Sequence, residues 1–157
     1  MAGSRIEREV VIAAPIEVVW RTVTEPDLIS QWFADRVTLD LKPGGRGELV
    51  FGASACDAAH SEAIVVETVE RPTRFSFRWA HPQGEAPVAD NSMLVEFTLQ
   101  PEGDEHTRLR VAESDLDVVA WPTQDKARYE QEHRQGWERC FSRLVRLPIE
   151  RHEHLEA

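Results

Sequence analysis

Hydrophobic and polar residues alternate along much of the chain, with a helical interruption near the N-terminus. Ile6, Val10 and Ile12 alternate with charged residues, which predicts a first half-buried strand. Pro15 and Pro26 stand where short helices can begin, because a first-turn residue needs no amide donor. Two short amphipathic helices are therefore predicted after this strand. Their apolar positions are Ile16, Val19, Trp20 and Val23, then Leu28, Ile29, Trp32 and Phe33.

From residue 37 onward the hydrophobic period changes from about 3.6 to 2, which is typical of strands. We predict six further strands, at 37–41, 47–51, 63–69, 75–79, 93–99 and 109–111. The pattern within 63–69 is ambiguous as to which face is buried. Pro43-Gly44-Gly45 and 101–104 have the composition of turns. The longer connections are 52–60, 81–91 and 115–122.

The last predicted element is a long helix from Thr123 or Asp125, either of which could cap its start, to Leu147 before Pro148. Its apolar stripe is Tyr129, His133, Trp137, Cys140, Phe141, Leu144 and Leu147. Burying each large member is worth about 1.5–3 kcal/mol, so the stripe can hold this helix on the sheet. Gly136 costs a helix roughly 1 kcal/mol relative to Ala. A close contact at this position, or a place in the wall of a pocket, would explain why the helix contains a glycine here.

This order predicts one α+β domain over 1–157, with its core at about 5–148 and frayed termini. We expect a curved antiparallel sheet of about six or seven strands that wraps the long C-terminal helix. Two short helices follow the first strand. A single helix does not easily fill a strongly curved sheet, so an apolar pocket is expected between them.

Composition and charge narrow the classes of protein. The chain has 41% hydrophobic and 29% charged residues, as in an ordinary globular domain, and its net charge is −10, which disfavours nucleic acid as a partner. It contains no apolar run of eighteen residues and no apolar N-terminal signal region, so no membrane span is expected. Cys56 and Cys140 lack metal or redox spacing, which favours reduced cysteines and a cytoplasmic location.

No motif for catalysis, metal binding or cofactor binding stands out. The glycine-rich stretch 43–47 lacks the Lys-Ser/Thr of a phosphate loop. The six histidines are scattered without the paired spacing of zinc ligands. We therefore expect no metal, no cofactor and no assigned catalytic residue.

His133 is the ionisable residue of most interest, because its spacing places it on the apolar face of the last helix. It is either a polar group inside a cavity or a core histidine satisfied by a neighbour. The aromatic side chains divide in the same way between plain core and pocket wall. The candidate ligand-binding residues are Trp32, Phe33, Phe77, Trp79, Met93, Phe97, Tyr129, His133, Trp137 and Phe141.

Several stretches, in order along the chain, carry a family likeness. They are 12–20 (IAAPIEVVW), 24–27 (TEPD) with Trp32-Phe33, 40–46 (DLKPGGR), 75–79 (FSFRW), 133–137 (HRQGW) and Leu144. In these the chain resembles the START/SRPBCC superfamily, the helix-grip fold. Within it, the chain is most similar to the branch named for the C-terminal domain of the activator of heat-shock-protein-90 ATPase. The resemblance implies a hydrophobic cavity between sheet and long helix, and it supplies no common catalytic residue.

Three functions follow as hypotheses. The first is binding of a small hydrophobic or amphipathic molecule in the cavity, without catalysis. The second is a cyclase or hydrolase that uses His133 with an acid such as Glu113 or Asp115. The third is a stress-related co-chaperone or interaction module. In that case Leu116, Val118, Val119 and Trp121 could form an apolar patch or a homodimer contact.

Overall fold

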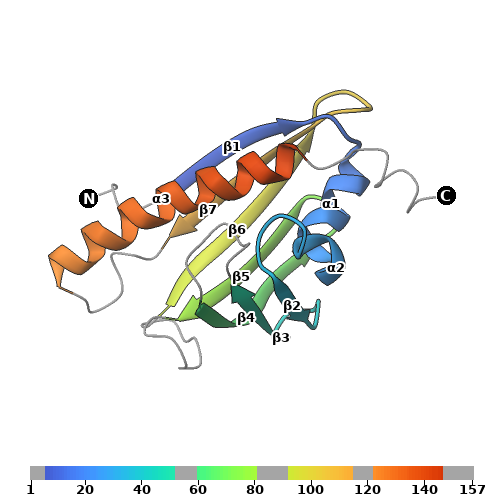
Figure 1. The fold of residues 1–157 in the computed structure, drawn as a ribbon. Coiled ribbons are helices and arrows are strands. Elements are labelled where there is room, and N and C mark those ends of the chain that lie inside the picture. Colours follow the sequence, from blue (N-terminus) through green and yellow to red (C-terminus); the bar gives the residue numbers. More distant parts are fainter. Residues whose placement is uncertain (1–5, 52–59, 81–91, 115–121, 147–157) are drawn as a thin grey trace.

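The computed structural model describes residues 6–51, 60–80, 92–114 and 122–146 (Figure 1). Along the chain the elements are β1 (Ile6–Ile12), α1 (Ile16–Thr24), α2 (Pro26–Ile29), β2 (Arg36–Leu39), β3 (Arg46–Phe51), β4 (His60–Glu70), β5 (Arg74–Ala80), β6 (Ser92–Pro101), β7 (Thr107–Ser114) and α3 (Thr123–Val145). This is the predicted order of one strand, two short helices, six strands and a long helix.

The seven strands form one antiparallel sheet in the order β1-β7-β6-β5-β4-β3-β2. Sequential hairpins account for all neighbours except β1, which pairs with the last strand along its whole length, Ile6 opposite Glu113 and Ile12 opposite Thr107. The sheet curves and α3 runs along one of its faces, with β1 and β7 beside it (Figure 1). The helix-grip prediction is confirmed.

The strand β4 differs from the prediction in its start and in the regularity of its pairing. It begins at His60 rather than at the predicted residue 63, so His60 belongs to the strand and not to a connection. Its pairing with β5 is irregular between Val66 and Thr68. After an irregularity of this kind, the alternation of inward and outward side chains restarts on the other face of the sheet. This explains why the sequence of 63–69 does not show clearly which face is buried.

The helices differ in detail as well. The helix α2 has only four residues, so Trp32 and Phe33 lie in the turns that follow it rather than on its face. The predicted capping of α3 is wrong, because Pro122 occupies the cap position and no side chain caps the helix. Asp125 lies in the first turn instead, where the helix dipole favours a carboxylate.

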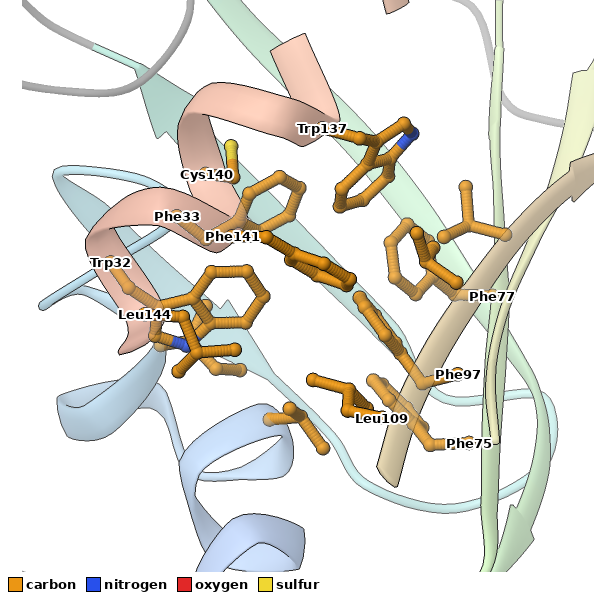
Figure 2. Packing of buried hydrophobic residues seen from close by; sticks show 14 of the residues in the cluster. Trp32, Phe33, Phe75, Phe77, Phe97, Leu109, Trp137, Cys140, Phe141 and Leu144 are labelled. Atoms are coloured by element: carbon orange, nitrogen blue, oxygen red, sulfur yellow. The ribbon is translucent and has the colours of Figure 1, made fainter. Parts of the chain in front are cut away.

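The core lies between α3 and the sheet and is dominated by aromatic rings (Figure 2). Trp32 is 1% exposed and donates its indole N–H to the backbone oxygen of Thr22 at 3.0 Å, which fixes the turn after α2 against α1. The ring of Phe97 contacts those of Trp32 and Trp137, with centroids 6.2 and 5.8 Å away. Contacts of this kind join α3, the α2 turn and the middle of the sheet.

The opposite face of the sheet is charged and paired across strands. Arg110 pairs with Glu7 at 2.6 Å, and Arg108 pairs with both Glu9 and Glu102. Arg74 likewise contacts Glu70 and Glu96. Because these pairs are exposed to solvent, they contribute little stability and mainly keep this face polar.

Two further findings concern membrane-spanning helices and the state of the cysteines. Among the described residues, no helix is long and apolar enough to span a membrane. Cys140 is buried and disulfide-bonded, so the expectation of reduced cysteines is not met. The spacing of cysteines in the sequence could not indicate this disulfide, because spacing does not show which distant parts of the chain come together. Cys56 lies outside the described residues.

Replacement of a ring at the centre of the core should destabilise the domain strongly. Phe97→Ala removes a side chain that is 2% exposed, and we expect a loss of about 3–5 kcal/mol in the free energy of unfolding. Val11→Ala is the control, because Val11 is 47% exposed on β1 and its loss should change stability by no more than about 0.5 kcal/mol. Urea denaturation of both variants checks this. Similar midpoints would contradict the assignment of Phe97 to the core.

Candidate functional site

A carboxylate lies inside the apolar layer between sheet and helix. Along β7, Leu109, Val111 and Glu113 alternate toward α3, and all three are at most 1% exposed. Burying an ionised carboxylate is costly unless hydrogen bonds satisfy it. The groups that surround Glu113 therefore decide whether this arrangement is stable.

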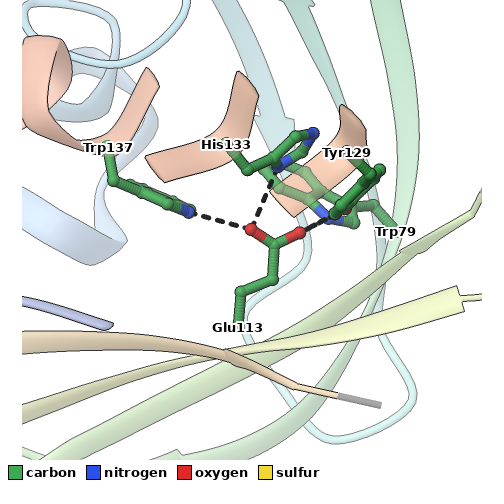
Figure 3. Close-up of polar contacts among 5 residues, drawn as sticks. All are labelled: Trp79, Glu113, Tyr129, His133 and Trp137. Atoms are coloured by element: carbon green, nitrogen blue, oxygen red, sulfur yellow. Dashed lines mark hydrogen bonds and ion pairs between the residues drawn. The ribbon is translucent and has the colours of Figure 1, made fainter. Parts of the chain in front are cut away.

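Four donors satisfy the two oxygens of Glu113 (Figure 3). Its Oε1 accepts from the indole N–H of Trp137 at 2.9 Å and lies 3.0 Å from Nδ1 of His133. Its Oε2 accepts from the indole N–H of Trp79 at 3.0 Å and from the hydroxyl of Tyr129. The cluster of Trp79, Glu113, Tyr129, His133 and Trp137, here called the carboxylate cluster, joins β5, β7 and α3.

The partners determine the charge state of Glu113. Burial alone would raise its pKa, but the charge interaction with His133 and the hydrogen bonds from His133, Tyr129 and Trp137 outweigh burial and hold the pKa below the ordinary 4.5. An indole N–H can only donate, and an ionised carboxylate can only accept, so the two kinds of group match. At neutral pH Glu113 is therefore ionised.

The helical members of the cluster share one face of α3, since Tyr129, His133 and Trp137 are four residues apart. The rings of Tyr129 and His133 stack, with centroids 3.7 Å apart and planes at 15°. Burial, together with the neighbouring charge of Glu113, raises the pKa of Tyr129 well above 10. Tyr129 is therefore a neutral hydrogen-bond donor.

The environment of Glu113 also sets the tautomer of His133. Because the carboxylate is ionised, Nδ1 of His133 carries the proton and donates to Oε1. In the neutral imidazole the second nitrogen, Nε2, is then the acceptor. The side chain of His133 is 21% exposed, and its second nitrogen lies on the side away from Glu113 (Figure 3).

Two small cavities are lined by described residues. The first, of about 10 Å³, lies deep in the core and is entirely apolar. The second, of about 20 Å³, adjoins the carboxylate cluster and is lined by Phe33, Trp79, His133, Gly136, Trp137 and Cys140. A cavity of about 10–15 Å³ is enough for one water molecule, which also needs polar partners. Only the second cavity, here called the His133 cavity, is large and polar enough for a water.

Gly136 borders the His133 cavity. Of the described residues, only Nη2 of Arg139 comes within 4.0 Å of the position that a Cβ atom would take. Close packing by these residues therefore does not require glycine here. Of the two explanations that the sequence left open, its place in the wall of the cavity is the better supported.

The structure places the sequence-predicted site residues in three groups. Trp32, Phe77 and Phe97 line the deep apolar cavity, and Phe33 lines both cavities. Trp79, His133 and Trp137 belong to the carboxylate cluster and the His133 cavity. Met93, Tyr129 and Phe141 are buried but line neither cavity. Whether any of them contacts a ligand stays a prediction.

Glu113, Gly136 and Cys140 were missing from the predicted binding residues. Glu113 had been considered only as an acid that could assist His133, although a signal was present in the strand. The alternation of Leu109 and Val111 continues to position 113 and places its carboxylate on the inner face. Asp115, the other acid considered with His133, lies outside the described residues.

The cluster can hold a proton at a fixed place and present a hydrogen-bond acceptor beside an aromatic cavity. It is not a metal site, because a single carboxylate and a single imidazole are too few ligands. Among the residues that the structure describes, no group of three or more His, Cys, Asp or Glu side chains could hold a metal ion.

The sheet that wraps a long helix around a partly polar interior defines a helix-grip protein of the START/SRPBCC type. Within that class the chain belongs to the family described as activator of Hsp90 ATPase homolog 1-like protein, whose sequence profile matches residues 13–147. The resemblance seen in the sequence is thereby confirmed. No curated protein matches the chain significantly.

Solved structures share the fold. Protein MLL2253 from Mesorhizobium loti is 24% identical, with a TM-score of 0.72 over 91% of this chain and 95% of that one. PFC0360w, an HSP90 activator from Plasmodium falciparum, is 17% identical, with a TM-score of 0.67 over 89% and 92%. The Aha1 dimer from Colwellia psychrerythraea is 15% identical, with a TM-score of 0.61 over 85% and 90%. At these identities the likeness establishes the fold alone.

Removing the charge of Glu113 should destabilise the domain. In Glu113→Gln an amide nitrogen replaces one carboxylate oxygen. This nitrogen is a donor and would face the donors of the cluster, so we expect a loss of about 2–3 kcal/mol in the free energy of unfolding. Glu9→Gln is the matched control, because Glu9 lies on the exposed face of the sheet and pairs with Arg108. Its denaturation midpoint should stay close to that of the unaltered protein. Equal effects of the two substitutions would show that Glu113 is not held as described.

The contribution of Glu113 should also depend on pH. Because its folded pKa is below 4.5, its ionised form stabilises the fold fully above about pH 4.5, and this contribution is lost as pH falls through the folded pKa. The difference in free energy of unfolding between the unaltered protein and Glu113→Gln should therefore shrink between pH 6 and pH 3. Denaturation series across this range measure it. A difference that grows toward acid would indicate that Glu113 is protonated in the folded state.

Proposed function

We propose that this protein binds a small amphipathic molecule between the sheet and α3, without catalysing a reaction on it. The ligand would enter at the His133 cavity, with its apolar part against Phe33, Trp79 and Trp137 and its polar group at His133. The observation that carries this proposal is the buried Glu113–His133 pair, which positions a polar nitrogen at the border of an aromatic cavity. The fold supports it as well, because the family's helix-grip architecture is suited to ligand binding.

A role in stability alone explains the carboxylate cluster less well than ligand binding does. Replacing a buried ion pair by well-packed apolar residues is often neutral or stabilising. Apolar side chains at positions 113 and 133 could thus hold α3 on the sheet at least as firmly, although they would not fix its register. The arrangement that is present adds a fixed hydrogen-bonding group beside the cavity, which is what a site for an amphipathic molecule needs.

The size of the His133 cavity sets a condition on binding. About 20 Å³ is room for a single water molecule, so a ligand that enters between the rings would displace side chains that border the cavity. The largest of these are the rings of Phe33, Trp79 and Trp137, which would exchange contacts with one another for contacts with the ligand. The apolar area that the rings bury against one another is nearly equal to the area that they would bury against the ligand. The polar group of the ligand should therefore contribute much of the selectivity.

Gly136 offers a direct test. Gly136→Leu would fill the space beside the cavity, whereas Gly136→Ala adds one methyl group and should raise helix stability by about 1 kcal/mol. Native mass spectrometry and thermal-shift screening against hydrophobic metabolites should identify ligands that raise the melting temperature of the unaltered protein. Gly136→Leu should lose this shift, and Gly136→Ala should keep it. The proposal fails if no ligand copurifies and none of the metabolites raises the melting temperature.

An enzymatic function is the second candidate, and the distance of 3.0 Å between Nδ1 of His133 and Oε1 of Glu113 favours it. A carboxylate that orients an imidazole is a frequent arrangement in general-base catalysis. The two candidates differ in the fate of the ligand. A bound molecule that is recovered unchanged after incubation supports binding alone, and a mass change that requires His133 supports catalysis.

A chaperone-related function is an alternative that the family and the names of two similar structures support. The structure from Colwellia psychrerythraea is a dimer, which makes a homodimer a reasonable proposal for this chain. The apolar residues suggested for such a contact lie outside the described residues. A cytoplasmic location and a role in stress response stay predictions from the sequence.

A further inference from the structure

One aromatic ring separates the two cavities. Of the described residues that line them, Phe33 alone borders both the His133 cavity and the deep apolar cavity. Phe33 is 5% exposed, and its ring stacks on those of Trp137 and Trp32, with centroids 5.2 Å apart in both pairs (Figure 2). Each cavity by itself is about the size of one water molecule. The space that would join them is therefore the space that Phe33 fills.

Hydrogen bonds hold the three indoles beside the cavities in place. The indole N–H groups of Trp79 and Trp137 donate to Glu113, so moving either ring would take a donor from a buried carboxylate. Trp32 lies in the wall of the deep apolar cavity and donates its indole N–H to the backbone oxygen of Thr22. A ligand that displaced any of these rings would break a buried hydrogen bond.

Phe33 differs from the indoles because its side chain has no polar atom. Its described contacts are with other rings, and an apolar ligand can replace such contacts. It lies in the turn between α2 and β2, outside any helix or strand. Rotation of its side chain would leave the hydrogen bonds around Glu113 intact. Among the rings that border the His133 cavity, Phe33 is thus the one that a ligand displaces at the smallest cost.

The space formed when the ring of Phe33 moves would be polar at one end only. The described walls of the deep apolar cavity are entirely apolar and include Val37 on β2, Leu49 on β3 and Ile64 on β4. A polar group buried against these walls would lose its hydrogen bonds to water without replacement. The polar group of an amphipathic ligand should therefore stay at the His133 cavity, with its apolar part directed toward the deep apolar cavity.

We infer that the ligand has an elongated apolar chain, which passes the displaced ring of Phe33 and ends in the deep apolar cavity. Phe33 is then a specificity-determining residue, because its displacement decides whether the chain of a ligand can enter. This inference rests on the proposed function, since it names the ligand class of the same site. It concerns the apolar part of the ligand and is independent of the polar group at the other end.

Two straight-chain alcohols, 1-hexanol and 1-decanol, test the inference on the unaltered protein. Both carry an uncharged hydroxyl, and they differ by four methylene groups. By isothermal titration calorimetry, 1-decanol should bind at least about tenfold more tightly, since full burial of one methylene group is worth roughly fourfold in affinity. In protein with labelled methyl groups, the terminal methyl of bound 1-decanol should give nuclear Overhauser effects to Leu49 and Ile64.

A variant that fills the deep apolar cavity provides a second measurement. Val37 is half-buried on the edge strand β2 and lines this cavity but not the His133 cavity. Val37→Phe should weaken binding of 1-decanol at least about fivefold and that of 1-hexanol less than about twofold, because it removes space only for the end of the chain. Leu41→Phe is the matched control, since Leu41 is 38% exposed and lines neither cavity, and it should change neither affinity. Circular dichroism and the denaturation midpoint show whether both variants fold.

The outcomes separate this inference from the proposed function. Absence of nuclear Overhauser effects to Leu49 and Ile64, or unchanged binding of 1-decanol to folded Val37→Phe, would overturn the inference. Binding at the His133 cavity would then still stand if Gly136→Leu abolishes binding of both alcohols. If Gly136→Leu binds both alcohols as the unaltered protein does, the proposed site and the inference fail together. If neither alcohol binds the unaltered protein, the inference is overturned, and the screen of hydrophobic metabolites decides the proposed function separately.

Discussion

A buried negative charge with four donors is the interaction on which the arrangement of helix and sheet depends. Glu113 is on β7, Trp79 is on β5, and Tyr129, His133 and Trp137 are on α3. Apolar contacts alone tolerate sliding, because they have no direction. Hydrogen bonds to one carboxylate do not, because a shift of α3 would move Tyr129, His133 and Trp137 away from the oxygens of Glu113 that they now contact. The cluster therefore fixes the register of the helix on the sheet.

This constraint also shapes the interior. The rings around the cluster pack closely against one another, and the two cavities described among them are about the size of a water molecule. A ligand site in such an interior works by exchange of contacts rather than by filling a preformed volume. In the site that we propose, selectivity would depend on the polar group beside the cavity, the imidazole of His133.

The fold and the function of this protein rest on different observations. Membership of the family and the likeness to solved structures establish the architecture. The same fold hosts unrelated functions, so the function has to be argued from the chain's own residues. For the function that we propose, those residues are the carboxylate of Glu113, the imidazole of His133 and the rings beside the cavity.

Local pattern and turn chemistry determined most of the fold. The alternation in β1, β5 and β6, the prolines before the short helices and the stripe of α3 are short-range features, and each was legible in the sequence. The errors occurred where tertiary context decides, as in the irregular pairing of β4, the cap of α3 and the disulfide of Cys140. Alternation could place Glu113 on the inner face of β7. Only the tertiary structure could show that two indoles, a phenol and an imidazole meet there, because they come from elements distant in the chain and meet only when the sheet closes on the helix.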